Sequence, residues 1–155
     1  MSDSSPAPFS DPAGTWNSRF DSDTYLFGTT PNDWLREHAG QSTPGQRILC
    51  VADGEGRNSV WLAEQGLTVN AFDIAELGMA KAHKLAAARG VTVNYVTSDC
   101  DGYQWPEGGY DGVAAIFVQF RRPGHARAHV LEHQALSQAR RHAGASGLWN
   151  RAIIS

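Results

Sequence analysis

The sequence has few cysteines and no excess of positive charge, and each shortage excludes a class of protein. Only Cys50 and Cys100 occur among the 155 residues, and both fall on or beside predicted strands. Two buried thiols indicate a reduced, cytoplasmic protein rather than a secreted one built on disulfides. The net charge of −3 gives no basic field of the kind that attracts nucleic acid, so we expect no nucleic-acid partner.

The beginning of the chain lacks an apolar core. Residues 1–14 are rich in serine, proline and aspartate, which excludes a signal peptide or a membrane span there and predicts a disordered segment. We therefore expect no membrane partner. The rest of the chain suffices for one domain, because a chain of this length can bury about two-thirds of its unfolded surface. We place that domain at residues 15–136.

What the chain does contain is a strand, a glycine loop, a helix and a second strand in succession. Residues 47–51 form an apolar run typical of a buried strand. Residues 59–66 predict a short helix that ends at Gly66, and residues 68–72 predict a second strand with Asp73 at its tip. This order is that of half of a nucleotide-cofactor fold.

Gly54 and Gly56 lie in the loop of this unit. Residues without a Cβ let the backbone approach a ligand, and the start of the following helix favours an anionic group. Asp73, 19 residues after Gly54, can accept both hydrogen bonds of a ribose diol. Taken alone, the glycines are equally compatible with an ordinary tight turn that needs positive φ. The complete unit predicts a ribose-bearing cofactor.

Strands and helices continue to alternate along the chain, which predicts an α/β fold with a doubly wound, mostly parallel sheet. Helices are expected at residues 31–38 with Thr30 as the N-cap, at 75–89 and at 123–141, and strands at 91–97 and 111–117.

Residues 53–66 resemble the first motif of class I S-adenosylmethionine-dependent methyltransferases. They are most similar to the small bacterial branch that includes tellurite- and thiopurine-methylating enzymes, in which the glycine loop continues into Arg-Asn-Ser, found here at 57–59. Later segments resemble the second motif, the third motif and the fourth strand of this family, in the family's order; they are residues 71–82, 96–101 and 110–117. The resemblance covers residues 16–136.

This resemblance implies a Rossmann-like methyltransferase fold that binds S-adenosylmethionine. The glycine loop would hold the methionine end, Asp73 the ribose, and Asp99 with Cys100 the adenine edge. The family often has an acid and a glycine where Cys50 and Ala52 stand here, so Asp53 or Glu55 would supply the acidity near the methionine ammonium. The predicted cofactor-binding residues are Asp53, Gly54, Glu55, Gly56, Asn58, Asp73, Ile74, Asp99, Cys100 and Phe117.

The resemblance also implies a small-molecule methyl acceptor. Residues 16–20 and 25–32 resemble the family's N-terminal cover, which folds over the cofactor; a hydrophobic clasp that only shields a sheet edge is the alternative. Because the sulfonium already activates the methyl group, a soft sulfur, selenium or tellurium nucleophile needs no general base, and we assign no catalytic residue. The predicted substrate-contacting residues are Trp16, Arg19, Tyr25, Phe27, Gln119 and Phe120.

Three histidines recur every four residues on the predicted helix at 123–141, namely His125, His129 and His133. Such a stripe can bind Zn²⁺ or Ni²⁺. A partly exposed polar helix face has the same pattern, however, and we predict no metal site.

The family resemblance stops after Leu136. Residues 137–155 lack the Pro-Gly-Gly turn that the family usually has, and only residues 152–154 hint at a strand. We expect an atypical tail on a chain truncated or altered after Leu136, without the last strands of the sheet; a natural minimal variant is the alternative. The strand at 111–117 would then present an uncovered edge, which favours a homodimer.

Two other functions are weighed against methyl transfer. A nicotinamide-dependent oxidoreductase would need a third glycine near Ser59 and a hydride-transfer acid or base, and neither is evident. A non-catalytic cofactor-binding remnant would account for the missing last strands. S-adenosylmethionine-dependent methyl transfer to a small molecule is the prediction.

Overall fold

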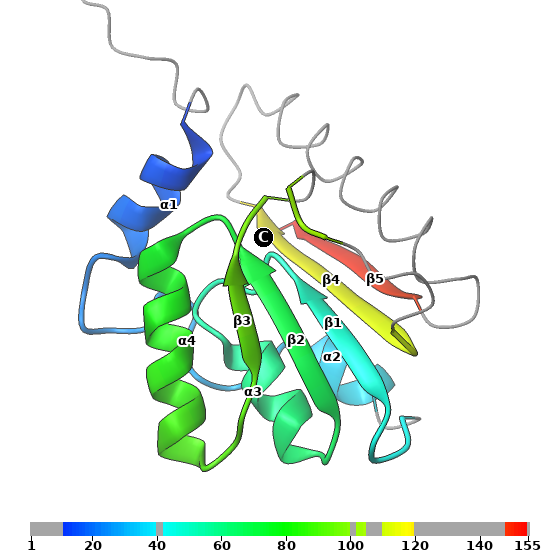
Figure 1. Cartoon of the computed structure of the whole chain (residues 1–155). Coiled ribbons are helices and arrows are strands. Elements are labelled where there is room, and N and C mark those ends of the chain that lie inside the picture. Colours follow the sequence, from blue (N-terminus) through cyan, green and yellow to red (C-terminus); the bar gives the residue numbers. More distant parts are fainter. Residues whose placement is uncertain (1–10, 40–41, 100–101, 105–109, 120–147, 155) are drawn as a thin grey trace, which may run out of the picture.

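The computed structural model of the chain describes residues 11–39, 42–99, 102–104, 110–119 and 148–154. Within them it shows a five-stranded sheet in the order β3-β2-β1-β4-β5, and every strand pair is parallel (Figure 1). The order reverses direction between β1 and β4, which confirms the predicted doubly wound fold. The strands are β1 (Arg47–Val51), β2 (Thr68–Asp73), β3 (Asn94–Thr97), β4 (Gly112–Gln119) and β5 (Leu148–Ile154).

The helices in the described part of the chain are α1 (Pro12–Phe20), α2 (Asp33–His38), α3 (Arg57–Glu64) and α4 (Glu76–Arg89). Figure 1 shows α2 and α3 on the far side of the sheet and α4 beside β3. None of these helices has the length and the apolar character that crossing a membrane requires.

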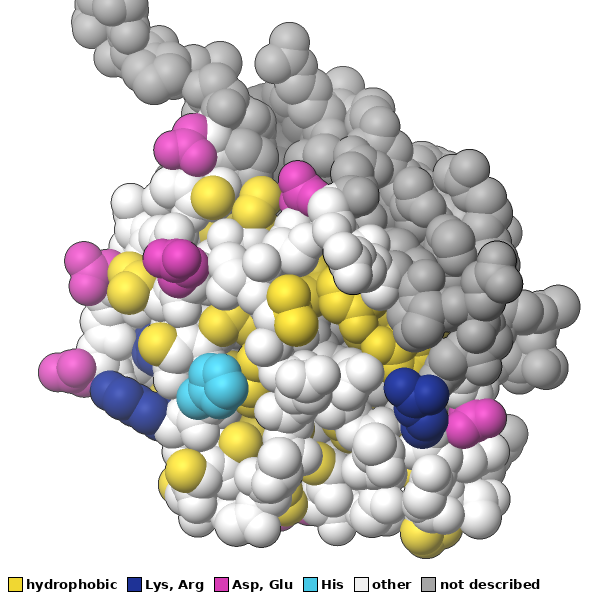
Figure 2. Space-filling model, viewed as in Figure 1, with side chains coloured by type: hydrophobic (Ala, Val, Ile, Leu, Met, Phe, Trp, Pro, Cys, Tyr) yellow, Lys and Arg dark blue, Asp and Glu magenta, His cyan; other side chains and the backbone are white. Residues whose placement is uncertain are grey.

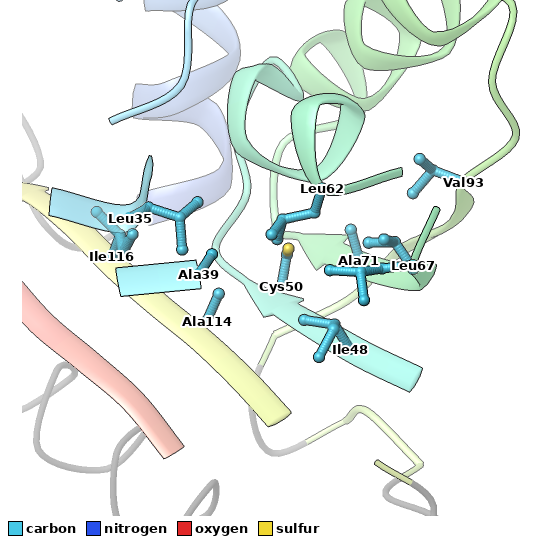
Figure 3. Close-up of a cluster of buried hydrophobic side chains, with 11 residues drawn as sticks. Leu35, Ala39, Ile48, Cys50, Leu62, Leu67, Ala71, Val93, Ala114 and Ile116 are labelled. Carbon is cyan, nitrogen blue, oxygen red and sulfur yellow. The ribbon is translucent and has the colours of Figure 1, made fainter. Parts of the chain in front are cut away.

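One face of the sheet packs against α2 and α3. Alternate strand residues point to the same side, so Ile48 and Cys50 of β1 share this face with Ala71 and Ala114 of the neighbouring strands. Figure 3 shows these side chains beneath Leu62 of α3, in a cluster that also includes Leu35 of α2.

The alternate positions on the strands are buried as well. Leu49, Val51 and Val113 are each at most 1% exposed. Burial of both faces is typical of a parallel sheet, and it explains why these strands are nearly continuous apolar runs in the sequence. On the side of the molecule shown in Figure 2, apolar side chains lie across the middle, and Lys and Arg side chains are separated from one another towards its sides.

The structure corrects several predicted element boundaries. Helix α2 begins at Asp33 with Asn32 as its N-cap, because the Asn32 side chain accepts the N–H of Leu35 at 3.2 Å; Thr30, the predicted cap, lies two residues earlier. Helix α3 begins at Arg57, two residues before the predicted start, because Gly56 occupies the N-cap with φ of 90°. Strand β3 begins only at Asn94.

The start of the chain is also more ordered than predicted. Helix α1 begins at Pro12, inside the segment that we expected to be disordered through Gly14. The Asp11 side chain accepts the N–H of Gly14 at 3.0 Å, and a proline in the first turn suits a helix start. Residues 1–10 lie outside the described part.

The tail supplies a strand where an uncovered edge was expected. Strand β5 pairs with β4 from Val113↔Leu148 to Gln119↔Ile154. The edge of the strand predicted at residues 111–117 is therefore occupied by β5. Strand β5 begins at Leu148, four residues before the short strand that the sequence suggested at residues 152–154. The predicted helix at 123–141, its three histidines and residues 137–147 lie outside the described residues.

Candidate functional site

The loop between β1 and α3 lies at the carboxyl end of β1, beside the reversal in strand order. Its backbone enters the left-handed region three times, with φ of 53° at Ala52, 63° at Gly54 and 90° at Gly56. A small concavity opens next to it, which is the place where ligands of open α/β sheets bind. The residues that line the concavity are Cys50, Val51, Ala52, Asp53, Asn58, Ala114 and Ile116.

The two loop glycines serve different purposes. A Cβ at Gly56 would lie 2.7 Å from the Cβ of Ala82 and 3.0 Å from the Tyr95 hydroxyl, so Gly56 lets α4 and β3 pack closely against the loop. A Cβ at Gly54 would meet only the Phe20 ring, at 3.4 Å. Gly56 therefore makes room for the protein itself, and the neighbour found at Gly54 is also a protein side chain. That Gly54 lets the backbone approach a ligand stays a prediction.

Asp73 ties the glycine loop to the start of α4. Its Oδ2 accepts the N–H of Gly54 and its Oδ1 accepts the N–H of Ala75, each at 2.9 Å. Burial raises the pKa of this carboxyl, and backbone N–H donors, including that of Ile74, act in the opposite direction. The residue predicted to bind a ribose thus also fixes the loop; Ile74, its half-buried neighbour, donates to it through the backbone.

Asp53 is held by Ser59 beneath the loop. Its Oδ2 accepts the Ser59 hydroxyl at 2.5 Å and its Oδ1 accepts the Ser59 N–H at 3.2 Å. The Ser59 and Tyr95 hydroxyls lie 2.8 Å apart. Burial raises the pKa of Asp53 to about 7, with a further contribution from the charge of Asp73, while the Ser59 hydrogen bonds oppose the shift. Neither Ser59 nor Tyr95 was among the predicted site residues. Their contact joins residues 36 positions apart in the sequence, so no local pattern indicated it.

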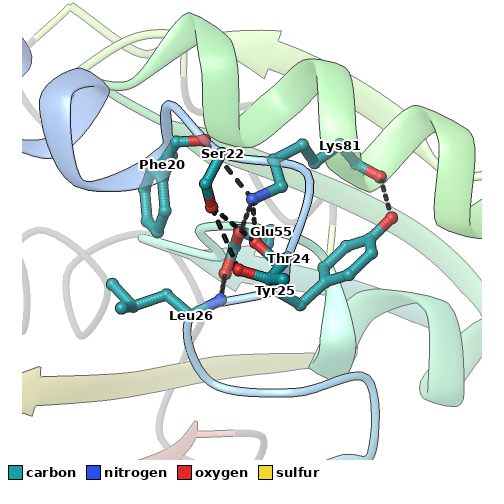
Figure 4. A network of polar contacts seen from close by, with 7 residues as sticks. All are labelled: Phe20, Ser22, Thr24, Tyr25, Leu26, Glu55 and Lys81. Atoms are coloured by element: carbon teal, nitrogen blue, oxygen red, sulfur yellow. Dashed lines mark hydrogen bonds and ion pairs between the residues drawn. The ribbon is translucent and has the colours of Figure 1, made fainter.

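Glu55 has protein partners instead of facing the concavity. The side chain is 3% exposed. Its Oε1 accepts the N–H of Leu26 at 2.7 Å, and its Oε2 forms an ion pair with Lys81 of α4 (Figure 4). Glu55, one of the two acids expected to supply the acidity near the methionine ammonium, thus anchors the N-terminal part of the chain, whereas Asp53, the other, lines the concavity. Nothing in the sequence indicated Lys81 as the partner of Glu55.

Asn58 and its neighbour Arg57 likewise contact the N-terminal part. The Asn58 Oδ1 accepts the N–H of Asn32 at 2.9 Å, which connects the first turn of α3 to the cap of α2. Arg57 donates to the Phe27 carbonyl at 3.5 Å and lies over the Phe27 ring, 5.7 Å from its centroid. Burial lowers the pKa of Arg57.

Residues 16–27, which we call the lead segment, lie against the glycine loop. The Trp16 ring stacks on Phe20 at 5.5 Å and tilts against Phe27 at 6.5 Å. Arg19 lies 5.3 Å from the Trp16 ring centroid. Three of the predicted substrate-contacting residues are thus brought together, while Tyr25 donates its hydroxyl to the Lys81 carbonyl at 3.0 Å and so belongs to the contact with α4.

The remaining predicted residues lie at the ends of β3 and β4. Asp99 is exposed just after β3, and its Oδ1 accepts the N–H of Gly102 at 2.6 Å. Phe117 and Gln119 lie in the last part of β4, in register with Ala152 and Ile154 of β5. Cys100 and Phe120 lie outside the described residues. Within the described ranges, no three His, Cys, Asp or Glu side chains form a group that could hold a metal ion.

Several solved methyltransferase structures resemble this fold. A TehB-like SAM-dependent methyltransferase from Corynebacterium glutamicum is 23% identical with a TM-score of 0.54, and the match covers 77% of this chain and 59% of that one. A SAM-dependent methyltransferase from Geobacter sulfurreducens, in complex with S-adenosyl-L-homocysteine, is 19% identical with a TM-score of 0.62, covering 83% and 51%. Magnesium protoporphyrin IX methyltransferase from Synechocystis PCC 6803, with bound SAM, is 25% identical with a TM-score of 0.51, covering 69% and 50%.

The chain thus spans about half of the length of these structures. No curated protein matches it. The family model described as a methyltransferase domain matches residues 48–147, a range that runs from the second residue of β1 through the glycine loop, Asp73 and β4. Because this match covers more than half of the chain, the protein belongs to the methyltransferase domain family.

Proposed function

We propose that the chain binds S-adenosylmethionine and takes part in transferring its methyl group to a small-molecule acceptor. The observation that carries the proposal is the arrangement at the β1–β4 reversal, where the glycine loop, Asp73 and a concavity meet at the carboxyl ends of the strands. Membership of the methyltransferase domain family supports it. The Synechocystis and Geobacter structures hold SAM and S-adenosyl-L-homocysteine, respectively.

The residues at the loop suit such a cofactor. Ala52 is exposed and Asp53 lines the concavity, while a Cβ on Gly54 would meet only the Phe20 ring. Each oxygen of a carboxylate can accept about two hydrogen bonds, so Asp73 keeps some acceptor capacity for a ribose hydroxyl after binding the N–H groups of Gly54, Ala75 and Ile74. Exposed Asp99, at the end of β3, would meet the adenine edge.

When bound, the cofactor supplies a methyl group that its sulfonium already activates. The chain's own residues then have to orient the cofactor towards the acceptor and exclude water, because holding the two reactants in the right geometry lowers the barrier to transfer. Asp73 fixes the glycine loop for this purpose, and the aromatic rings of Trp16, Phe20 and Phe27 in the lead segment provide an apolar surface beside it.

We propose a soft nucleophile, a sulfur, selenium or tellurium anion, as the acceptor. Asp53 is the one carboxylic acid that lines the described concavity, and Ser59 holds both of its oxygens. Such a site suits an acceptor that needs no general base, whereas oxygen or nitrogen acceptors more often require one. The Arg-Asn-Ser at residues 57–59 supports the tellurite- and thiopurine-methylating branch.

Calorimetric titration of the chain with S-adenosylhomocysteine, and separately with NAD, tests the cofactor. We expect binding of S-adenosylhomocysteine alone. Preferential binding of NAD would replace the proposal with the oxidoreductase alternative. Transfer of a labelled methyl group to a thiol, selenite or tellurite then tests the acceptor; binding without transfer to any acceptor would indicate a non-catalytic cofactor-binding domain.

A further inference from the structure

The Glu55–Lys81 ion pair joins the glycine loop, α4 and the lead segment at one buried point. The side chains of Glu55 and Lys81 are only 3% and 12% exposed. A buried ion pair is costly to desolvate, and it persists where further hydrogen bonds satisfy its atoms. At this pair, those further bonds come from the lead segment.

Main-chain groups of the lead segment bind both members of the pair. Lys81 Nζ donates to the carbonyl of Thr24 at 2.5 Å and to that of Phe20 at 3.3 Å. Glu55 Oε1 accepts the N–H of Leu26 at 2.7 Å. Figure 4 shows the ammonium and the carboxylate lying between the two ends of the turn that these residues form. The turn therefore closes around the charges of the pair.

The same segment packs directly on the glycine loop. Phe20 is 3% exposed and lies 3.4 Å from the position of a Cβ on Gly54 and 2.9 Å from one on Gly78. The Asn17 side chain accepts the N–H of Leu77 in the first turn of α4 at 3.0 Å. The loop and the lead segment are thus held at several points and form one unit.

We propose that Glu55 and Lys81 are positioning residues, which hold the lead segment closed against the glycine loop and thereby raise the affinity of the loop for the cofactor. The proposal rests on the proposed function for the identity of the cofactor. A ligand that binds better to the closed arrangement must stabilise it in return, because coupling between two sites is reciprocal. Glu55 acts here through the lead segment, without touching the cofactor itself.

Hydrogen exchange and cofactor titration on the same variants test this proposal. Glu55→Gln keeps an acceptor for Leu26 but removes the charge that pairs with Lys81, and Lys81→Met removes the ammonium while keeping the length of the side chain. In both variants the Leu26 amide should exchange at least about tenfold faster, and the dissociation constant for S-adenosylhomocysteine should rise about tenfold, as expected for loss of a charged hydrogen bond.

A second ion pair offers a matched control. Glu64 of α3 and Arg89 of α4 lie 3.2 Å apart, about one-third exposed and without a hydrogen bond to the lead segment. Glu64→Gln and Arg89→Met make the same changes of charge and should leave both readouts unchanged. The double variant Glu55→Gln with Lys81→Met should be less impaired than the sum of its single changes, because neither charge is left unpaired.

The outcomes separate this proposal from the proposed function. Unchanged exchange at Leu26 in Glu55→Gln would overturn the anchoring role. Faster exchange with unaltered cofactor affinity would overturn the coupling and leave a purely structural ion pair. If the unaltered chain bound no S-adenosylhomocysteine, the proposed function would fail, and the coupling to that cofactor would fail with it.

Discussion

The backbone N–H of Gly54 donates a hydrogen bond to Oδ2 of Asp73 at 2.9 Å, across 19 residues of sequence. The glycine loop is therefore tied to the tip of β2 by the same carboxylate that the sequence assigns to the ribose. Asp73 also accepts the N–H of Ala75, so a single side chain sets the positions of the loop and of the start of α4. If Asp73 also binds the ribose as proposed, one side chain serves both the fold and the cofactor.

Substitution of Asp73 should reduce both stability and cofactor affinity. The backbone N–H groups of Gly54, Ala75 and Ile74 would lose their buried acceptor in Asp73→Ala. The free energy of unfolding should fall by about 1–3 kcal/mol, as measured by urea denaturation. Calorimetry should show a loss of about 2–4 kcal/mol in the binding free energy of S-adenosylhomocysteine.

The exposed Asp33 provides the control for this prediction, because Asp33→Ala removes a carboxylate whose side chain is 83% exposed. It should change the free energy of unfolding by less than about 0.5 kcal/mol. A folded Asp73→Ala protein that binds S-adenosylhomocysteine normally would refute the ribose assignment. Unaltered stability would refute the tie between the loop and α4.

An alanine at Gly56 should destabilise the fold far more than an alanine at Gly45. Both positions have φ of 90°, a left-handed conformation in which any side chain strains the backbone. Only at Gly56 would the new Cβ meet other atoms, 2.7 Å and 2.9 Å from the Cβ and Cα of Ala82. At Gly45 nothing lies within 4 Å. We expect Gly45→Ala to cost about 1 kcal/mol and Gly56→Ala at least about 2 kcal/mol more.

The difference between these two variants isolates the packing of α4 from backbone strain, and thermal or urea unfolding can measure it. Equal losses at Gly45 and Gly56 would mean that α4 moves away from the loop at little cost. In that case Gly56 would be free for the ligand-facing role that the sequence suggests.

Asp53 should make stability depend on pH below neutrality. Its pKa rises from 3.8 to about 7 on folding, principally because the group is buried. Between those two values the folded state binds more protons than the unfolded state, so the free energy of unfolding decreases as the pH rises from about 4 to about 7. Each unit of difference in pKa corresponds to about 1.4 kcal/mol. Asp73, whose pKa is also raised by burial, contributes in the same direction.

Asp53→Asn should remove most of this dependence, because the amide stays uncharged and its oxygen can still accept the Ser59 hydroxyl. The measurement is urea unfolding of both proteins at several pH values between about 4 and 8. Asp33→Asn, at an exposed position, should retain the slope of the unaltered chain. If the free energies of unfolding of Asp53→Asn and of the unaltered chain differed by the same amount at every pH, the raised pKa of Asp53 would be contradicted.

The parts of the site that the sequence predicts are those encoded locally. Strand β1 is an apolar run, and Asp73 follows the next apolar run directly. Neighbouring residues carry all of that information. The role of Glu55 could not be read in this way, because its partner Leu26 is 29 residues distant and is bound through its backbone, which has no sequence signature.

Strand β5 in the tail was likewise not predicted in full, because its pairing partner is distant in the sequence. Apolar and polar residues do not alternate regularly over residues 148–154. Strands of parallel sheets often lack that alternation, so the sequence pattern alone does not identify this strand. Its pairing with β4 is set by the whole sheet, so comparison with the family's usual motifs led to the expectation of an open edge.

Removal of β5 should therefore destabilise the domain and expose β4. Strand β5 lies in register with β4 over seven positions, from Leu148 to Ile154. A chain ending at residue 147 should lose that ladder and present the unpaired main-chain groups of β4, which are a template for self-association. We expect a lower thermal midpoint and, by light scattering, dimers or larger species that the full chain does not form to the same extent. This reverses the expectation from the sequence, in which the full chain itself carried the open edge.

If the shortened chain kept its thermal midpoint and its oligomeric state, β5 would contribute nothing to the sheet, and the account of a tail foreign to the domain would stand. A lower midpoint accompanied by unchanged S-adenosylhomocysteine affinity would show that β5 supports the sheet without contributing to the proposed cofactor site, which lies at the carboxyl ends of β1, β2 and β4.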